Sequence, residues 1–128
     1  MSALACPCGS GSSYRHCCRP LLRAQWPAAT AEALMRSRYT AYVRRDEAYL
    51  LRTWKASRRP ESLDLDDTIW LGLEILATDL GGADDTRGTV EFVAHYEDTH
   101  GAVDAVRERS RFARVAGAWV YVDGETPR

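Results

Sequence analysis

The sequence predicts an α+β protein in which helices pack on one face of a curved antiparallel sheet, with a small module ahead of them. Three observations support this class. Residues 31–44 show helical spacing of apolar side chains, residues from 68 onward alternate with a period of two, and residues 1–20 hold four cysteines without apolar periodicity. Because the helices precede a run of strands, we expect the two kinds of element to form separate layers.

The first predicted helix covers residues 31–44, which contain neither glycine nor proline. Thr30 suits the N-cap position, and Glu32 places a carboxylate in the first turn, where the helix dipole favours it. At 100° per residue, one face collects four apolar side chains and is predicted to be buried: Leu34, Met35, Tyr39 and Tyr42. A second, short helix is expected to follow a cap at Asp46 and to run over residues 48–54.

The alternation of apolar and polar residues predicts four strands, at 68–78, 87–98, 103–115 and 119–122. Turns are expected at 81–85, at 99–101 and at Gly117. The alternation groups two sets of side chains, each on one face of its strand: Val90, Phe92, Ala94 and Tyr96, and then Val106, Glu108, Ser110 and Phe112. The short turns make an antiparallel meander the expected topology.

Length and composition limit the chain to one compact domain with a small appendage. It has 128 residues, of which 45% are hydrophobic and 27% charged, as in soluble globular proteins. No run approaches the roughly 20 apolar residues of a membrane span, and residues 1–5 lack the basic start and apolar stretch of a signal peptide. We therefore expect a cytoplasmic protein with reduced thiols and no membrane association.

Charge is distributed unevenly, although the net charge is only −1. Residues 1–60 hold 11 Lys and Arg against 3 Asp and Glu, whereas residues 61–128 hold 6 against 15. Such asymmetry fits a surface for nucleic acid or another acidic partner, and it also fits two halves of one domain that attract each other. The sequence leaves both interpretations open.

The four cysteines predict a metal site. They occur as Cys6-Pro7-Cys8 and, after eight further residues, as Cys17-Cys18. Zinc prefers four soft ligands in a tetrahedron, and two thiolates from each end of a small loop provide them. Four thiolates leave no position for water, so we expect one structural zinc ion whose binding energy orders the segment.

Disulfide or thiol chemistry and inert thiols are the alternatives to a metal. The adjacent Cys17 and Cys18 are poorly placed to bond each other, and two disulfides conflict with a reducing cytoplasm. His16 could replace one thiolate, although four cysteines already complete the ligand set. Otherwise its ring is expected to point outward or to support a ligand by a hydrogen bond.

Residues 6–18, with the sequence CPCGSGSSYRHCC, resemble the SEC-C zinc module of the SecA translocation motor and of many small bacterial proteins. In that module two cysteines, a third cysteine and a final cysteine or histidine bind zinc. The resemblance assigns these roles to Cys6, Cys8, Cys17 and Cys18. Ser12 and Ser13 stand where the module usually carries lysine.

The rest of the chain resembles the YchJ-like family of bacterial proteins, whose middle domain has the cone-shaped, cystatin-like fold of nuclear transport factor 2. The resemblance lies in ALMRSRYTAY at 33–42 and in residues 49–50, 53–54, 90–96, 108–112 and 119–124. It implies a SEC-C-like motif at 1–20, a connector at 21–29 and a nuclear transport factor 2-like domain at 30–128. Leu21, Leu22 and Trp26 are expected to anchor the motif to the domain.

A cone of this kind implies a pocket between the helices and the concave face of the sheet. The candidate pocket residues are Arg38, Tyr39, Tyr42, Trp54, Tyr96, Glu108, Ser110 and Phe112. We predict that Arg38 and Glu108 form an ion pair inside the cone. The pair either provides polar contacts in a ligand pocket or only satisfies two buried charges.

The remaining charged residues give weaker signals. Arg107, Arg109 and Arg111 form a basic stripe on one strand face, but exposed aromatic residues do not alternate with them as in nucleic-acid-binding surfaces. His95 shares a strand face with acidic residues, which is typical of a solvated face. No nucleophile with an adjacent base is evident, so we do not expect an enzyme.

Three functions remain. The favoured one is a binding or adaptor protein that docks on another protein through its zinc module. The second is a small-molecule-binding protein or an enzyme that uses the pocket, with Glu108 as the acid–base candidate. The third is an RNA- or ribosome-associated protein. A homodimer through the convex face of the sheet is a further expectation.

Overall fold

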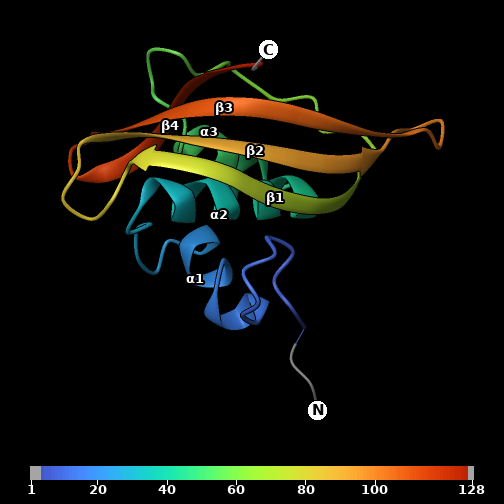
Figure 1. Cartoon of the computed structure of the whole chain (residues 1–128), viewed down its shortest axis with the longest axis horizontal. Helices are drawn as coiled ribbons and strands as arrows, with labels where there is room; N and C mark the ends of the chain where they lie inside the picture. The colour runs from blue at the N-terminus through green and yellow to red at the C-terminus, as the bar shows by residue number, and fades with distance from the viewer. Residues whose placement is uncertain (1–3, 127–128) are drawn as a thin grey trace.

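A computed structural model describes residues 4–126, and Figure 1 shows them as three layers. The first layer is an antiparallel sheet of β1 (Ile69–Leu80), β2 (Arg87–Glu97), β3 (Val103–Val115) and β4 (Ala118–Glu125), which neighbour one another in chain order. Helices α2 (Ala31–Arg44) and α3 (Glu47–Arg52) cover one face of the sheet. The α+β class and the four-stranded meander are therefore confirmed.

The two outer strands are longer than the alternation predicted. β1 extends to Leu80 instead of ending at residue 78, and β4 covers 118–125 instead of 119–122. In both cases pairing with a neighbour carries the strand further: Leu80 pairs with Gly88, and Glu125 pairs with Arg109. Strand ends depend on cross-strand partners that a local pattern does not contain.

Both predicted helix caps are present. The Thr30 hydroxyl accepts a hydrogen bond from the Ala33 amide at 3.0 Å, and the Asp46 carboxylate accepts one from the Tyr49 amide at 3.1 Å. These caps satisfy amide groups that the first turn of a helix leaves free.

Helix α3 ends at Arg52, although the pattern predicted a helix to residue 54. Beyond Arg52 the chain pairs with β4, because the Tyr121 amide donates to the Thr53 carbonyl and the Lys55 amide donates to the Tyr121 carbonyl, each at 2.8 Å. This pairing brings Trp54 next to β4 and places it beside the helices.

Helix α2 is buried on two sides. The predicted face packs toward the sheet, with Leu34, Met35 and Tyr39 buried and Tyr42 half-buried. Several residues outside that face are also buried, among them Ser37, Thr40 and Ala41. A helix that is buried on two sides needs a packing partner on each. The second cover is the amino-terminal module.

The amino-terminal module forms the third layer, on the side of α2 that faces away from the sheet (Figure 1). It contains the 3-10 helix η1 (Tyr14–His16) and the short helix α1 (Arg19–Leu22), which runs across the predicted boundary between motif and connector. Leu21 and Leu22 pack against the core as expected. Trp26 does not, because its side chain is 58% exposed. Among the described residues no helix is long and apolar enough to cross a bilayer.

Two glycines allow the turn between β1 and β2 to touch the start of α2. The Gly81 carbonyl accepts a hydrogen bond from the Ala31 amide at 2.9 Å, and Gly81 has a φ of +82°. A Cβ atom at Gly81 would lie 2.8 Å from the Ala31 Cβ, and one at Gly88 would overlap backbone atoms of Gly81. The turn can therefore pack this closely only because Gly81 and Gly88 carry no side chains.

We expect Gly88→Ala to lower the free energy of unfolding by about 2–3 kcal/mol, because rigid backbone atoms cannot move aside for the new methyl group. Urea denaturation measures the change. Gly82→Ala is the matched control in the same turn, since its Cβ would meet only the flexible Asp85 carboxylate at 3.4 Å. Equal losses for the two variants would contradict this packing.

Candidate metal centre and candidate pocket

The four cysteine sulfur atoms lie together in the amino-terminal module, all within 4.8 Å of one another. Cys8 Sγ is 3.6 Å from Cys17 Sγ, and Cys17 Sγ is 3.9 Å from Cys18 Sγ. A tetrahedron with Zn–S bonds of about 2.3 Å has sulfur–sulfur edges of about 3.8 Å. All four thiols are free of disulfide bonds. The cluster can therefore hold one metal ion.

Local backbone geometry produces this cluster from the two cysteine pairs. The Cys6 amide donates to the Ser12 carbonyl at 2.9 Å and the Gly9 amide donates to the Cys6 carbonyl at 3.2 Å, which closes a tight loop around Cys8. Gly9 adopts a φ of +77°, which favours glycine. The second cysteine pair lies between η1 and α1, and Cys17 Sγ contacts Cys8 Sγ of this loop.

The thiols influence one another strongly. Hydrogen bonds with the thiols of Cys18 and Cys6 hold the pKa of Cys8 far below its usual value. Burial raises the pKa of Cys17 to about 11, and hydrogen bonds with Cys6 and Cys8, together with burial, raise the pKa of Cys18. Without a cation one thiolate charge is thus stabilised by neighbouring thiols, whereas four thiolates need a metal ion to balance their charge.

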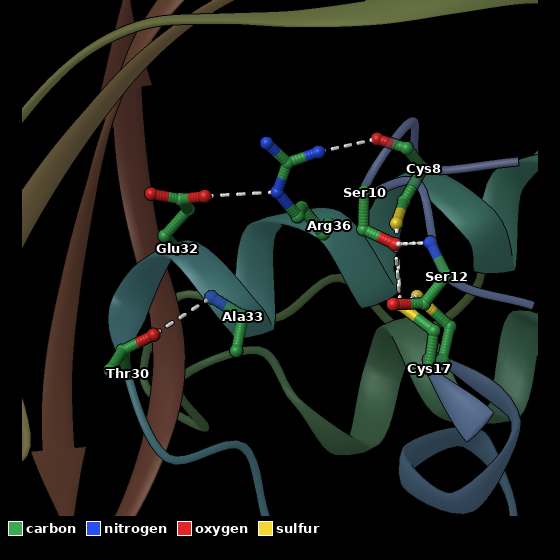
Figure 2. A network of polar contacts seen from close by, with 9 residues as sticks. Cys8, Ser10, Ser12, Cys17, Thr30, Glu32, Ala33 and Arg36 are labelled. Atoms are coloured by element: carbon green, nitrogen blue, oxygen red, sulfur yellow. Dashed lines mark hydrogen bonds and ion pairs between the residues drawn. The ribbon is translucent and has the colours of Figure 1, made fainter. Parts of the chain in front are cut away.

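Helix α2 positions the cluster. Arg36 Nη1 donates to the Cys8 carbonyl at 2.6 Å, and Arg36 Nε donates to Glu32 Oε2 at 2.9 Å. Figure 2 shows this guanidinium between the helix carboxylate and the cysteine loop. One turn further along α2, Thr40 Oγ1 lies 3.7 Å from Cys6 Sγ. The spacing from Arg36 to Thr40 puts both contacts on the same face of the helix.

Ser10 is a neighbour of the cluster that the sequence analysis did not single out. Its hydroxyl oxygen lies 3.1 Å from Cys17 Sγ and accepts a hydrogen bond from the Ser12 amide at 3.2 Å (Figure 2). His16 does not join the four sulfur atoms: its Nδ1 lies 3.0 Å from the Ser13 hydroxyl, and its side chain is exposed. The serine within the loop could have been noticed, because hydroxyl groups often support metal-bound thiolates.

A cavity of about 240 Å³ lies between α2 and the sheet. Six of the eight candidate pocket residues line it: Arg38, Tyr39, Tyr42, Trp54, Glu108 and Ser110. The other two candidates do not line the cavity but pack against residues that do. Tyr96 packs against Trp70 and Phe112 packs against Tyr121, with ring centroids 5.7 and 5.8 Å apart. The lining residues that the sequence analysis missed are Met35, Trp70, Phe92, Ala94, Val106 and Tyr121.

The predicted ion pair between Arg38 and Glu108 is wrong. Arg38 Nη1 donates to the Leu50 carbonyl at 2.8 Å and to Thr53 Oγ1 at 2.7 Å, both at the end of α3. Among the described residues no carboxylate lies within ion-pair distance of this guanidinium. The helix end supplies neutral acceptors, so Arg38 turns toward α3 rather than toward β3.

Glu108 has its own hydrogen-bond donors. Its Oε2 accepts a hydrogen bond from Ser110 Oγ at 2.5 Å and one from the Tyr121 hydroxyl at 3.3 Å. Burial and the Glu108 charge raise the pKa of Tyr121, which keeps that hydroxyl protonated as a donor. Gly124 leaves room for the carboxylate, because a Cβ there would overlap Glu108. The sheet itself thus holds Glu108 in place.

Residues 30–124 match the family described as the YchJ middle NTF2-like domain. The chain belongs to this YchJ family. It is 52% identical over 122 residues to a UPF0225 protein of Streptomyces avermitilis, which covers 94% of this chain and 84% of the relative. A UPF0225 protein of Streptomyces coelicolor is 54% identical over 121 residues, which is 94% of each chain.

Two solved structures share the fold of this YchJ-family chain. The solution structure of a SEC-C motif containing protein from Rhodopseudomonas palustris superposes with a TM-score of 0.85 at 38% identity, covering 98% of this chain and all of the other. The crystal structure of a SEC-C motif containing protein from Psychrobacter arcticus gives a TM-score of 0.76 at 27% identity, covering 96% and 82%. The expected combination of a SEC-C motif and an NTF2-like domain is thus confirmed.

The basic stripe of this YchJ-family chain is paired with acidic side chains. The Glu91 carboxylate accepts hydrogen bonds from Arg107 at 2.5 Å and from Arg109 at 3.1 Å. The Asp123 carboxylate accepts one from Arg111 at 2.6 Å. These arginines lower the pKa of the half-buried Glu91 and Asp123 carboxyls. His95 Nε2 lies 3.1 Å from Glu74 Oε1 on the same solvated face. The stripe therefore offers little free positive charge.

We expect Ser10→Ala to weaken metal binding by the cysteine cluster about tenfold, because the variant lacks the hydroxyl next to Cys17 Sγ. Competition with a coloured chelator, using cobalt or zinc, measures the affinity. Ser12→Ala is the control, since only the backbone amide of Ser12 takes part in this contact. Equal affinities in all three proteins would show that Ser10 has no part in the site.

Proposed function

We propose that this protein is a cytoplasmic, zinc-containing binding protein whose SEC-C-like motif docks on an acidic surface of another protein. The closed set of four cysteines is the observation that carries this proposal. A metal ion with four thiolate ligands has no open position for water or substrate, so its role is structural. The zinc ion then stabilises a protruding surface and takes no part in a reaction.

Exposed arginines on and around the module support an acidic partner. Arg15 lies in the module, Arg23 directly follows α1, and Arg44 and Arg52 reach the module from α2 and α3; we call these four residues the basic face. Arg44 stacks over Tyr14, with 4.6 Å from its Cζ to the ring centroid, and Arg52 donates to the Leu22 carbonyl at 3.4 Å.

The basic face has charge available for a partner. None of its four arginines pairs with a carboxylate of the described residues, unlike the arginines of the stripe on β3. Trp26 in the connector and Leu4 ahead of the cysteine loop provide exposed apolar area, being 58% and 85% exposed. Aromatic and arginine side chains are enriched in protein interfaces, which fits a protein partner.

Removal of the metal tests the structural role of zinc. We expect zinc at one ion per chain by native mass spectrometry, and we expect chelation to abolish hydrogen-exchange protection in residues 4–20. The same treatment should lower the melting temperature by at least about 4 °C, because α2 loses its outer cover. Cys8→Ser and Cys17→Ser should reproduce both effects. Unchanged protection in chelator would refute the zinc proposal.

Affinity purification from the native bacterium, followed by binding assays with the purified partner, tests the docking proposal. We expect Arg15→Glu with Arg23→Glu to weaken binding at least tenfold and to leave the fold intact, because both side chains are exposed. Arg59→Glu with Arg87→Glu is the charge-matched control on surfaces away from the module. Complexes that disappear on nuclease treatment would instead indicate RNA binding.

A further inference from the structure

The cavity beneath α2 contains a buried cation that has no directly paired anion, although Glu108 lines the same cavity. Arg38 is only 4% exposed, and its Nη1 is bound to two neutral acceptors, the Leu50 carbonyl and Thr53 Oγ1. Its Nε and Nη2 donors have no acceptor among the described residues, although Arg38 lines the cavity. A buried charge is costly unless a counter-charge and hydrogen bonds compensate it.

Two aromatic rings fix the guanidinium in one orientation. Arg38 Cζ lies 5.2 Å from the ring centroid of Trp54 and 4.7 Å from that of Tyr121. Stacking offsets part of the cost of burial but brings no negative charge. Burial lowers the pKa of Arg38, yet an arginine side chain stays protonated at neutral pH. The cavity thus presents a fixed, charged donor edge.

The other lining groups set the kind of anion that fits. Tyr42, Trp70 and Phe92 provide aromatic walls, which favour a ligand with a flat apolar body. Glu108 lines the same cavity and is already held by Ser110 and Tyr121, so its charge repels a second negative group. The volume of about 240 Å³ accommodates about ten non-hydrogen atoms at the packing density of a protein interior.

We propose that this cavity binds a compact aromatic monocarboxylate, with the carboxylate on Arg38 and the ring against Tyr42, Trp70 and Phe92. The ligand supplies the directly hydrogen-bonded anion that Glu108, held by Ser110 and Tyr121, does not provide, and a guanidinium edge binds a carboxylate with two parallel hydrogen bonds. A single negative group suits a cavity that also contains Glu108. This site is separate from the docking surface on the amino-terminal module, so either proposal can fail without the other.

The first experiment uses the unmodified protein and three probes: benzoate, phenylacetate and 4-hydroxyphenylacetate. Each is titrated while the arginine Nε–H signals are followed by NMR, next to the corresponding uncharged amide. We expect at least one acid to shift the Arg38 signal saturably, and we expect its amide to bind at least tenfold more weakly. Equal binding of acid and amide, or no binding of any acid, would overturn the proposal.

Variants identify the groups responsible. Arg38→Met should weaken binding of the acid tenfold to a hundredfold and leave the weak binding of the amide unchanged. Arg87→Met is the matched control, because it removes an exposed arginine of β2 that lies outside the cavity. Glu108→Gln should tighten binding of the acid, since a like charge is lost.

Arg38 also joins α2 to α3, so the fold of Arg38→Met is checked by circular dichroism before binding is measured. If this variant does not fold, the wild-type comparison of acid with amide decides the question. Undiminished acid binding by a folded Arg38→Met protein would overturn the proposal.

Discussion

The packing of α2 between two different covers is the constraint on which the rest of this structure depends. One face of the helix carries Arg36 and Thr40, which contact the cysteine loop, and another carries Met35 and Arg38, which line the cavity. The cysteine cluster and the cavity therefore share one wall. Because the three buried cysteines belong to the same core cluster as α2, the amino-terminal module is part of the domain's packing rather than a separate appendage.

Features encoded by neighbouring residues could be predicted from the sequence. The caps at Thr30 and Asp46 depend on amides three residues away, and the strand faces follow from alternation, as the burial of Val90, Phe92 and Ala94 illustrates. The cysteine cluster belongs to the same class, since its four residues lie within 13 positions. The ends of β1, β4 and α3 were missed because pairing with distant segments sets them.

Features that depend on tertiary packing could not be predicted in detail. Strand periodicity groups Glu108 with Phe112 on one face, and the resemblance to the cone fold implies a pocket shared with Arg38, as the structure shows. Periodicity cannot show that the end of α3 offers a carbonyl and a hydroxyl closer to Arg38 than any carboxylate. Nor can it show that Trp26, an apolar residue in the connector, stays at the surface. Long-range polar contacts have no local signature.

The two sites therefore differ in how far they tolerate change elsewhere in the chain. The cysteine cluster depends on its own loop, with Arg36 and Thr40 adding contacts from outside it. The charge in the cavity depends on three elements at once, because α2 carries Arg38, the end of α3 supplies its acceptors, and β4 supplies Tyr121 beside it. A shift of α3 or β4 would remove the acceptors or the stacking ring and leave the guanidinium buried without compensation. The donor edge in the cavity is thus a property of the assembled fold, whereas the cysteine cluster is a property of one short segment.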